Sequence, residues 1–386
     1  MDAYIFRQCR RITAPIFFGY IAIGIPFGVM IVQAGYPWWM SLFMSLVMYS
    51  GAGQYIAAGL LGAGAGILEI VLTEFFVNIR HIVYGLSLIE KSKKAGRWKL
   101  PLVFTLTDET YAVLTSTDVP PGVPAGPFLG MIGILDFVYW TLGCVIGALA
   151  CSFLATYGLS DYLTGVDFAL TSLFVIILFS QIKASGDLLP PLTGFVSCLL
   201  SVILCRTGLL VSSNIIFLAI ILGIDAILLA RGRGFASGGA RQLATFVSFI
   251  VCSLVLAGLL VLMSLSEGSG GAASPAGNSG MAVAICASVL SGGVIFCERL
   301  FPFALFSKRN PPPAIQFVAR YIPSMVIAIL IVYSLKDVDL RSFPFGIPQL
   351  AGGIMALLLN VLVKNYLVTI FGSTAVFMVL SRFLQG

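Results

Sequence analysis

The chain has 386 residues, of which 59% are hydrophobic and 10% are charged. Because soluble domains carry about 25% charged residues, this composition excludes a largely soluble protein and predicts an all-α polytopic membrane protein. The formal net charge of +6 does not indicate nucleic-acid binding, since the basic residues lie in short loops and are typical of topology signals. Most of the eight cysteines lie inside apolar segments without a CxxC pair, so we expect buried thiols, no metal site and no cofactor.

Apolar runs follow one another along the chain, and most approach the roughly 20 residues that a helix needs to cross a bilayer. They lie near residues 13–34, 40–61, 66–88, 101–116, 128–154, 166–182, 189–205, 210–230, 243–265, 281–300, 316–335, 345–363 and 366–384. We predict about 11–13 hydrophobic helical segments, of which about eleven truly cross, with broken or re-entrant elements in the N-terminal half.

The run at 101–116 is a poor candidate for a crossing. It would extend only about 24 Å as a helix, and it carries Asp108 and Glu109 at its centre. If it does not cross, and one Gly-rich segment before it is broken, every Lys- and Arg-rich loop falls on the cytoplasmic side. This arrangement predicts a cytoplasmic N-terminus and a C-terminus on the outside.

The candidate for the break is the sequence SGAGQ at 50–54, which contains Gly51, Gly53 and Gln54. Two interpretations remain open. Such glycines either allow close packing between helices or mark an unwound helix whose free backbone groups contact substrate.

A GxxxG pattern formed by Gly24 and Gly28 recurs at Gly143 and Gly147. Inverted repeats are common in secondary transporters, so the two patterns are candidates for corresponding positions in such a repeat. We include Gly24, Pro26 and Gly28 among the broken-helix positions that present backbone to a substrate.

The run at 66–88 contains Glu69, Glu74, Asn78, Arg80 and the chain's single histidine, His81. A central charge on a spanning helix costs roughly 2.5–3.5 kcal/mol on insertion scales, so such residues normally face a partner or a water-filled path. Helical spacing places Glu74, Asn78 and His81 on one stripe and Glu69, Arg80 and Tyr84 on another.

These residues have functional and structural interpretations. His81, whose side chain ordinarily titrates near neutral pH, and Glu74 form a candidate proton-coupling pair. Arg80 suits a substrate carboxylate, but it equally suits an ion pair with Asp108 or Glu109. His81 could alternatively lie at the membrane interface, and Glu69 is better explained as a structural partner than as a proton carrier.

Four further charged residues lie in or near other spans. Asp136 and Asp225 could be second proton sites, although we favour helix-end positions for both. Arg299 lies next to Glu298 near the end of a run, where long side chains extend to the interface, so a structural role is favoured.

The composition of the chain changes along its length and divides it into residues 1–232, 233–280 and 281–386. The first part is long and Gly-rich, and the last is a compact set of four runs. Between them, Gly- and Ser-rich segments flank one plain apolar run at 243–265, which is typical of a linker with one extra span. Such a span would correct the side of the membrane on which the last part begins.

The first part resembles the AzlC family of branched-chain amino acid permeases, and the last part resembles AzlD, its small partner subunit. The matching stretches are GIPFG at 24–28, SGAGQYIAAGL at 50–60, NIRHIVYGLSL at 78–88, TDETYAV at 107–113, CERLFPFAL at 297–305, RYIPSMVIAIL at 320–330 and KNYLVTIFGSTAVF at 364–377. In the small-subunit motif the match rests on Arg299, Pro302 and Pro323. Glu298 and the extra span at 243–265 depart from the family pattern.

This resemblance implies a prokaryotic inner-membrane exporter of leucine, isoleucine, valine and methionine, with both subunits fused and with proton motive force as the energy source. Its expected partners are membrane lipid, the amino acid substrate, protons and a second copy of the chain in a homo-oligomer.

The main alternatives are a membrane-embedded enzyme and a transporter of another small hydrophobic solute. The chain contains no HExxH, no GxSxG and no P-loop of the GxxxxGK[ST] form, which argues against hydrolytic chemistry and an ATP-driven pump. It also lacks a carbonyl-rich filter signature of a channel. We therefore expect a transporter and not an enzyme.

Overall fold

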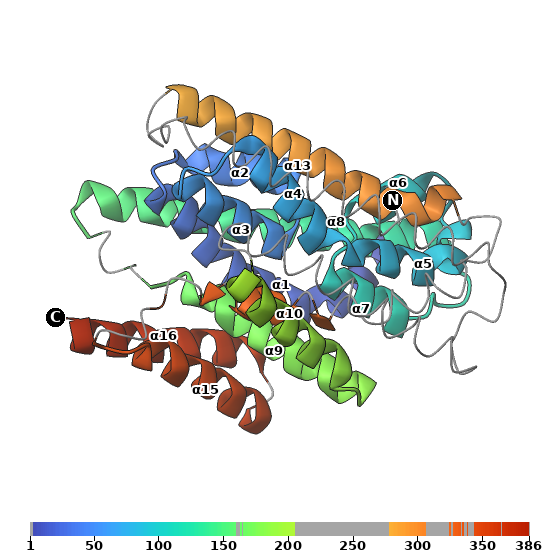
Figure 1. Ribbon diagram of the computed structural model, residues 1–386. Helices are drawn as coiled ribbons and strands as arrows, with labels where there is room; N and C mark the ends of the chain where they lie inside the picture. Colours follow the sequence, from blue (N-terminus) through green and yellow to red (C-terminus); the bar gives the residue numbers. More distant parts are fainter. Residues whose placement is uncertain are drawn as a thin grey trace. The chain divides into compact units, whose positions relative to one another are not determined.

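The computed structural model describes residues 3–159, 163, 165–204, 278–305, 324–325, 327–332, 334–335, 338, 343–363 and 365–385. Every regular element in these residues is a helix (Figure 1). The helices are α1 Ala3–Gln33, α2 Trp38–Val47, α3 Gly51–Gly62, α4 Ile67–Asn78, α5 Arg80–Lys93, η1 Gly96–Trp98, α6 Lys99–Phe104, α7 Asp108–Ser116, α8 Ala125–Thr156, α9 Phe168–Ser185, α10 Leu189–Leu204, α13 Asn278–Leu305, α15 Ile347–Leu362 and α16 Tyr366–Gln385. The predicted all-α class is confirmed.

Three of the described helices are long and apolar enough to cross a membrane: Ala3–Gln33, Ala125–Thr156 and Gly280–Ala304. Shorter apolar helices accompany them, including α2, α15 and parts of α9, α10 and α16. This composition confirms a helical membrane protein. The runs predicted at 210–230 and 243–265, together with Asp225 and Pro323, lie outside the described residues.

The chain divides into two compact units. One contains Met1–Ile176, Ser274–Asn310 and Asp337–Gly386, and the other contains Ile177–Ala273 and Pro311–Lys336. The site described below lies within the first unit. The predicted part boundaries at residues 232 and 280 remain predictions.

Helices α1 and α8 form the most extensive helix pair of the first unit. Their two GxxxG patterns face each other: a methyl group on Gly28 would lie 2.1 Å from the Cys144 carbonyl oxygen, and one on Gly147 would lie 2.0 Å from the Ile25 carbonyl oxygen. Glycines at these positions let the two backbones approach closely, and close approach of this kind stabilises helix pairs in lipid.

The prediction that the backbone is broken around Gly24, Pro26 and Gly28 is wrong. α1 runs without interruption from Ala3 to Gln33 with Pro26 inside it, and its glycines serve packing against α8. α1 also begins earlier than the predicted run, so the basic residues Arg7 and Arg10 lie on its first turns.

Three other predicted runs are divided into shorter helices. The run at 40–61 becomes α2 and α3, the run at 66–88 becomes α4 and α5, and the run at 101–116 becomes α6 and α7. α13, shown in orange in Figure 1, packs along α4 and α5 and also contacts α2 and α6. Helix α13 therefore lies beside all three divided runs.

Candidate functional site

The interruption between α2 and α3 lies at residues 48–50. Tyr49 has a φ of 42°, a left-handed conformation that is unfavourable for an aromatic residue and persists where the surrounding structure enforces it. The Gln54 side chain spans the interruption: its Oε1 accepts hydrogen bonds from the Ser50 N–H (3.3 Å) and the Trp140 Nε1–H (2.8 Å). Its Nε2 donates to Ser45 Oγ at 3.0 Å. Gln54 therefore joins both half-helices to α8.

Ile79, between α4 and α5, keeps a helical backbone conformation, so the second interruption of the helical backbone lies at residues 105–107, between α6 and α7. Thr107 caps α7, because its Oγ1 accepts a hydrogen bond from the Thr110 N–H at 3.3 Å. Asp108 and Glu109 occupy the first turn of α7, where the helix dipole favours negative charge. This N-terminus is thus already supplied with a cap and two carboxyl groups.

Arg299 of α13 joins the two interruptions. Its side chain is fully buried. Its Nη1 donates to the Phe104 carbonyl at the end of α6, and its Nη2 donates to the Tyr49 carbonyl after α2 at 2.5 Å. The guanidinium also lies 5.6 Å from the centre of the Tyr49 ring. Carbonyls at helix C-termini lack helical partners and carry partial negative charge, so one arginine stabilises both ends.

Pro302 holds the same region of α13 against α5. A methyl group on Gly85 would lie 2.8 Å from Pro302 Cγ and 3.2 Å from the Phe303 ring. Only a glycine allows α13 to approach α5 this closely, and this approach places Arg299 over the interruptions.

Arg80 forms an ion pair with Asp108. The Nη1 to Oδ2 distance is 3.1 Å, and the two side chains are 4% and 17% exposed. Tyr84 lies beside Asp108 and stacks on Tyr111 with ring centroids 4.5 Å apart. The bracing interaction considered for Arg80 is therefore present, and it fixes the start of α7 against α5.

Glu74 and Asn78 of α4 face the start of α3. Asn78 Nδ2 donates to Glu74 Oε2 at 2.9 Å, and Ser50 Oγ donates to Asn78 Oδ1 at 2.5 Å. A methyl group on Gly53 would lie 2.2 Å from Glu74 Oε2, so glycine is needed to admit the carboxyl group. Among the described residues, the buried Glu74 Oε1 has no hydrogen-bond partner.

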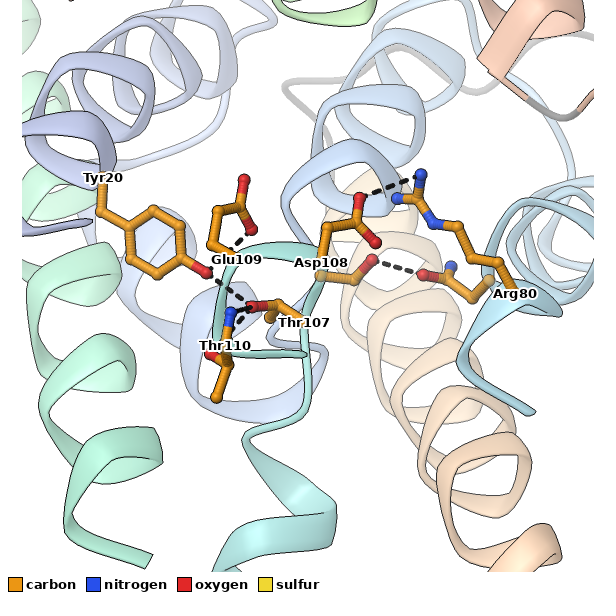
Figure 2. Close-up of polar contacts among 8 residues, drawn as sticks. Tyr20, Arg80, Thr107, Asp108, Glu109 and Thr110 are labelled. Carbon is orange, nitrogen blue, oxygen red and sulfur yellow. Dashed lines mark hydrogen bonds and ion pairs between the residues drawn. The ribbon is translucent and has the colours of Figure 1, made fainter. Parts of the chain in front are cut away.

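A chain of hydroxyl groups links α1, α7 and α8, and Figure 2 shows the part of it between Tyr20 and Thr110. Tyr20 Oη donates to Glu109 Oε2 at 3.0 Å and lies 2.6 Å from Thr107 Oγ1. Thr107 Oγ1 lies 3.0 Å from Thr110 Oγ1, which donates to Asp136 Oδ2 at 2.8 Å. Asp136 is fully buried.

The site as a whole carries an excess of acidic groups. Its carboxyl groups belong to Glu74, Asp108, Glu109, Asp136 and Glu298, while its guanidinium groups belong to Arg80 and Arg299. Glu298 lies close enough to Glu74 for the two to repel each other when both are ionised. Because isolated charges are costly in a buried setting, this set can bind protons or a cationic group.

Comparison with known proteins identifies the two parts of the chain. Residues 15–154 match the family described as AzlC protein, and residues 282–381 match the family described as branched-chain amino acid transport protein (AzlD). An uncharacterized membrane protein of Helicobacter pylori is 34% identical over 183 residues, which cover 47% of this chain and 78% of that protein.

The chain belongs to the AzlC and AzlD families, fused in one polypeptide.

Two further relatives carry informative names. The branched-chain amino acid transport protein AzlC of Bacillus subtilis is 29% identical over 52% of this chain and 76% of its own length. The inner membrane protein YgaZ of Escherichia coli is 30% identical over 47% of this chain and 76% of its own length. No solved structure matches the chain. The chain is thus a membrane protein of a branched-chain amino acid transport family.

The predicted polar residues of the run at 66–88 are buried beside the two interruptions, with one exception. Glu74, Asn78, Arg80, His81 and Tyr84 are buried, whereas Glu69 is exposed. Glu74 bonds to Asn78 rather than to His81, and the proton-coupling role of Glu74 and His81 stays a prediction. His81 instead lies edge-on to Tyr84, with ring centroids 5.9 Å apart, and near Arg80 and Arg299. The His81 side chain is buried within the protein.

The favoured helix-end position of Asp136 was wrong, whereas the favoured structural role of Arg299 agrees with its hydrogen bonds, although it does not arise in the expected way. Asp136 lies in the middle of α8 rather than at a helix end, because α8 continues on both sides of it. Arg299 does not extend to the interface, because the carbonyls of Tyr49 and Phe104 give it partners inside the protein.

Four residues of the site were not predicted from the sequence: Tyr20, Tyr49, Thr107 and Thr110. The first two resemble ordinary interfacial aromatics in a hydrophobic sequence, so no signal distinguished them. Thr107 could have been found, because a threonine directly before two acidic residues is typical of a helix N-cap.

Proposed function

We propose that the chain is a secondary active exporter of branched-chain amino acids in a prokaryotic cytoplasmic membrane, driven by proton motive force. Leucine, isoleucine and valine are the expected substrates, with methionine as a further candidate. The observation that carries this proposal is the buried polar site at the two helix interruptions, in a chain of a family whose names refer to branched-chain amino acid transport. Discontinuous helices of this kind commonly bind substrates and coupling ions in transporters.

A branched-chain amino acid carries a carboxylate, an ammonium group and a small apolar side chain. The start of α3 suits the carboxylate, since Ser50 makes no side-chain cap there and helix N-termini attract anions. The start of α7 suits it less, because Thr107 and two acidic residues already occupy it.

The acidic groups suit the ammonium group. Glu74 lies directly against the start of α3 and has one oxygen without a hydrogen-bond partner among the described residues. A zwitterion bound there would place both of its charges next to complementary groups. The Phe104 and Phe137 rings, whose centroids are 5.7 Å apart, pack against Tyr49 beside the same interruption and offer an apolar surface. An apolar pocket distinguishes one methylene by only about 1–3 kcal/mol, so the substrates should overlap.

The test is efflux of preloaded radiolabelled leucine from proteoliposomes with an imposed pH gradient. The native chain is compared with Glu74→Gln and His81→Ala. We expect gradient-driven efflux from the native chain and its loss in Glu74→Gln, because the amide keeps the shape but cannot hold the charge or the proton. Exposed Glu69 provides the matched control, and Glu69→Gln should behave like the native chain. If Glu74→Gln and His81→Ala both keep full gradient-driven efflux, their proposed role in coupling is wrong. If only another small solute moves, the substrate assignment is wrong.

A further inference from the structure

The hydrogen bonds between Glu109 and Asp136 are all formed only when the number of protons matches the number of contacts. It contains four contacts in series, from Glu109 to Tyr20, Tyr20 to Thr107, Thr107 to Thr110, and Thr110 to Asp136. Each of its three hydroxyl groups can donate one hydrogen bond and accept others. When both carboxyl groups are ionised, three protons serve four contacts, and one contact has no hydrogen.

One added proton completes the series. With the proton on Glu109, each group donates to the next: Glu109 to Tyr20, Tyr20 to Thr107, Thr107 to Thr110, and Thr110 to ionised Asp136. With the proton on Asp136, every donor direction is reversed and Glu109 is the ionised end. Both states satisfy all four contacts, and they differ by the shift of one proton per contact.

We propose that Tyr20, Thr107 and Thr110 form a relay that moves one proton between the carboxyl groups of Glu109 and Asp136. In the transfer, the Glu109 O–H bond breaks and its proton binds Tyr20 Oη. The Tyr20 proton passes to Thr107, the Thr107 proton passes to Thr110, and the Thr110 proton binds Asp136 Oδ2. All three hydroxyl groups end intact, and no other reactant is needed. This relay rests on the proposed function, for which it supplies the proton path.

The two ends of the relay have different access. Glu109 is half-buried, whereas Asp136 is fully buried within α8. A proton that arrives at Glu109 can therefore be passed to a carboxyl group that water does not reach directly.

Neighbouring charged groups influence whether the shared proton lies on Glu109 or on Asp136. Glu109 interacts with Asp108 of its own helix and with Arg80 of α5. Asp136 faces Glu109 of α7, Tyr20 of α1 and Tyr49 after α2. Because Arg80 pairs with Asp108 at 3.1 Å, any change in that ion pair changes the field at Glu109. Arg80 also interacts electrostatically with Glu74, so the relay is connected through Arg80 to the proposed substrate site.

The experiment separates movement of leucine from its coupling to protons. In proteoliposomes, leucine exchange at equal pH on both sides is measured next to efflux driven by a pH gradient, with an internal pH dye recording proton movement. The test variants are Tyr20→Phe and Thr110→Val, which remove one hydroxyl group each with little change of shape. Their controls are Thr110→Ser, which keeps the hydroxyl group, and Tyr139→Phe, which removes a tyrosine hydroxyl from α8 outside the relay, where it lies 3.4 Å from Thr13 Oγ1.

We expect Tyr20→Phe and Thr110→Val to keep exchange while gradient-driven efflux and leucine-dependent proton movement fall on the order of ten-fold or more. Thr110→Ser and Tyr139→Phe should keep both activities. Undiminished proton coupling in Tyr20→Phe and Thr110→Val overturns the relay and leaves the proposed function intact. Loss of exchange together with coupling also rejects the relay, because the hydroxyl groups would then serve folding or binding. A native chain that moves no leucine in either assay overturns the proposed function itself.

Discussion

Removal of the Arg299 guanidinium should strongly destabilise the protein, because this group stabilises the carbonyls at two helix interruptions. In Arg299→Met, the Tyr49 and Phe104 carbonyls lose their charged donor. Hydrogen bonds to charged groups contribute about 1.5–3 kcal/mol each, and a buried carbonyl left unpaired costs about 1–3 kcal/mol. The cost of burying a guanidinium offsets part of this gain. We therefore expect Arg299→Met to lower the free energy of unfolding by about 3–5 kcal/mol.

The assay is denaturant unfolding in detergent micelles, followed by tryptophan fluorescence. Arg299→Lys should lie between the native chain and Arg299→Met, since lysine keeps the charge but lacks the planar fork that reaches two carbonyls. Lys93→Met is the control: Lys93 pairs with Glu90 at 2.6 Å, but the side chains are 49% and 80% exposed. Such surface pairs contribute about 0.2–1 kcal/mol. An Arg299→Met variant no less stable than Lys93→Met would refute the role assigned to Arg299.

Two glycine substitutions test the packing that supports the site. Gly28→Ala should lower the free energy of unfolding by about 1–3 kcal/mol, because the new methyl group would lie 2.1 Å from the Cys144 carbonyl oxygen. The control is Gly293→Ala, which should be neutral or stabilising because no atom lies within 4 Å of its methyl group. Both are measured in the same unfolding assay. Gly53→Ala should reduce gradient-driven leucine efflux, measured in proteoliposomes, because its methyl group would displace the Glu74 carboxyl group from 2.2 Å. Equal stability of the Gly28 and Gly293 variants, or native efflux from Gly53→Ala, would contradict these assignments.

The helical class and the positions of most helices could be predicted from the sequence, because long apolar runs have few other folds in lipid. The predicted run at 128–154 corresponds to α8 at Ala125–Thr156, and the run at 189–205 corresponds to α10 at Leu189–Leu204. The segment at 50–54 was also a sequence-based candidate for an interruption, because glycines and Gln54 stand inside an apolar run. The interruption lies just before it, at residues 48–50, and residues 51–54 form the first turn of α3.

The partners of the buried charges could not be predicted in the same way. Arg299 lies 195 residues from Phe104 and 250 residues from Tyr49 along the chain, and no local pattern connects such distant positions. A snorkelling arginine and a buried arginine have the same sequence environment at the end of an apolar run. The difference is decided by tertiary contacts, here by the close approach of α13 to α5 at Gly85.

The same reasoning explains Asp136. One aspartate in an apolar run has no visible partner in the sequence, so a helix-end position was the simpler prediction. Its hydroxyl partner, Thr110, belongs to α7, and the start of α7 is joined to α1 by the Tyr20–Thr107 hydrogen bond. The position of α7 depends on the interruption before Asp108.

The most direct test of proton-coupled export is leucine efflux from proteoliposomes that contain the native chain, with the external side acidified relative to the lumen. Protons then enter down their gradient as leucine leaves. We predict that the gradient accelerates efflux, that the internal pH dye records acidification only when leucine is present, and that a protonophore abolishes the acceleration. Leucine efflux that is the same with and without the gradient would contradict proton-coupled export.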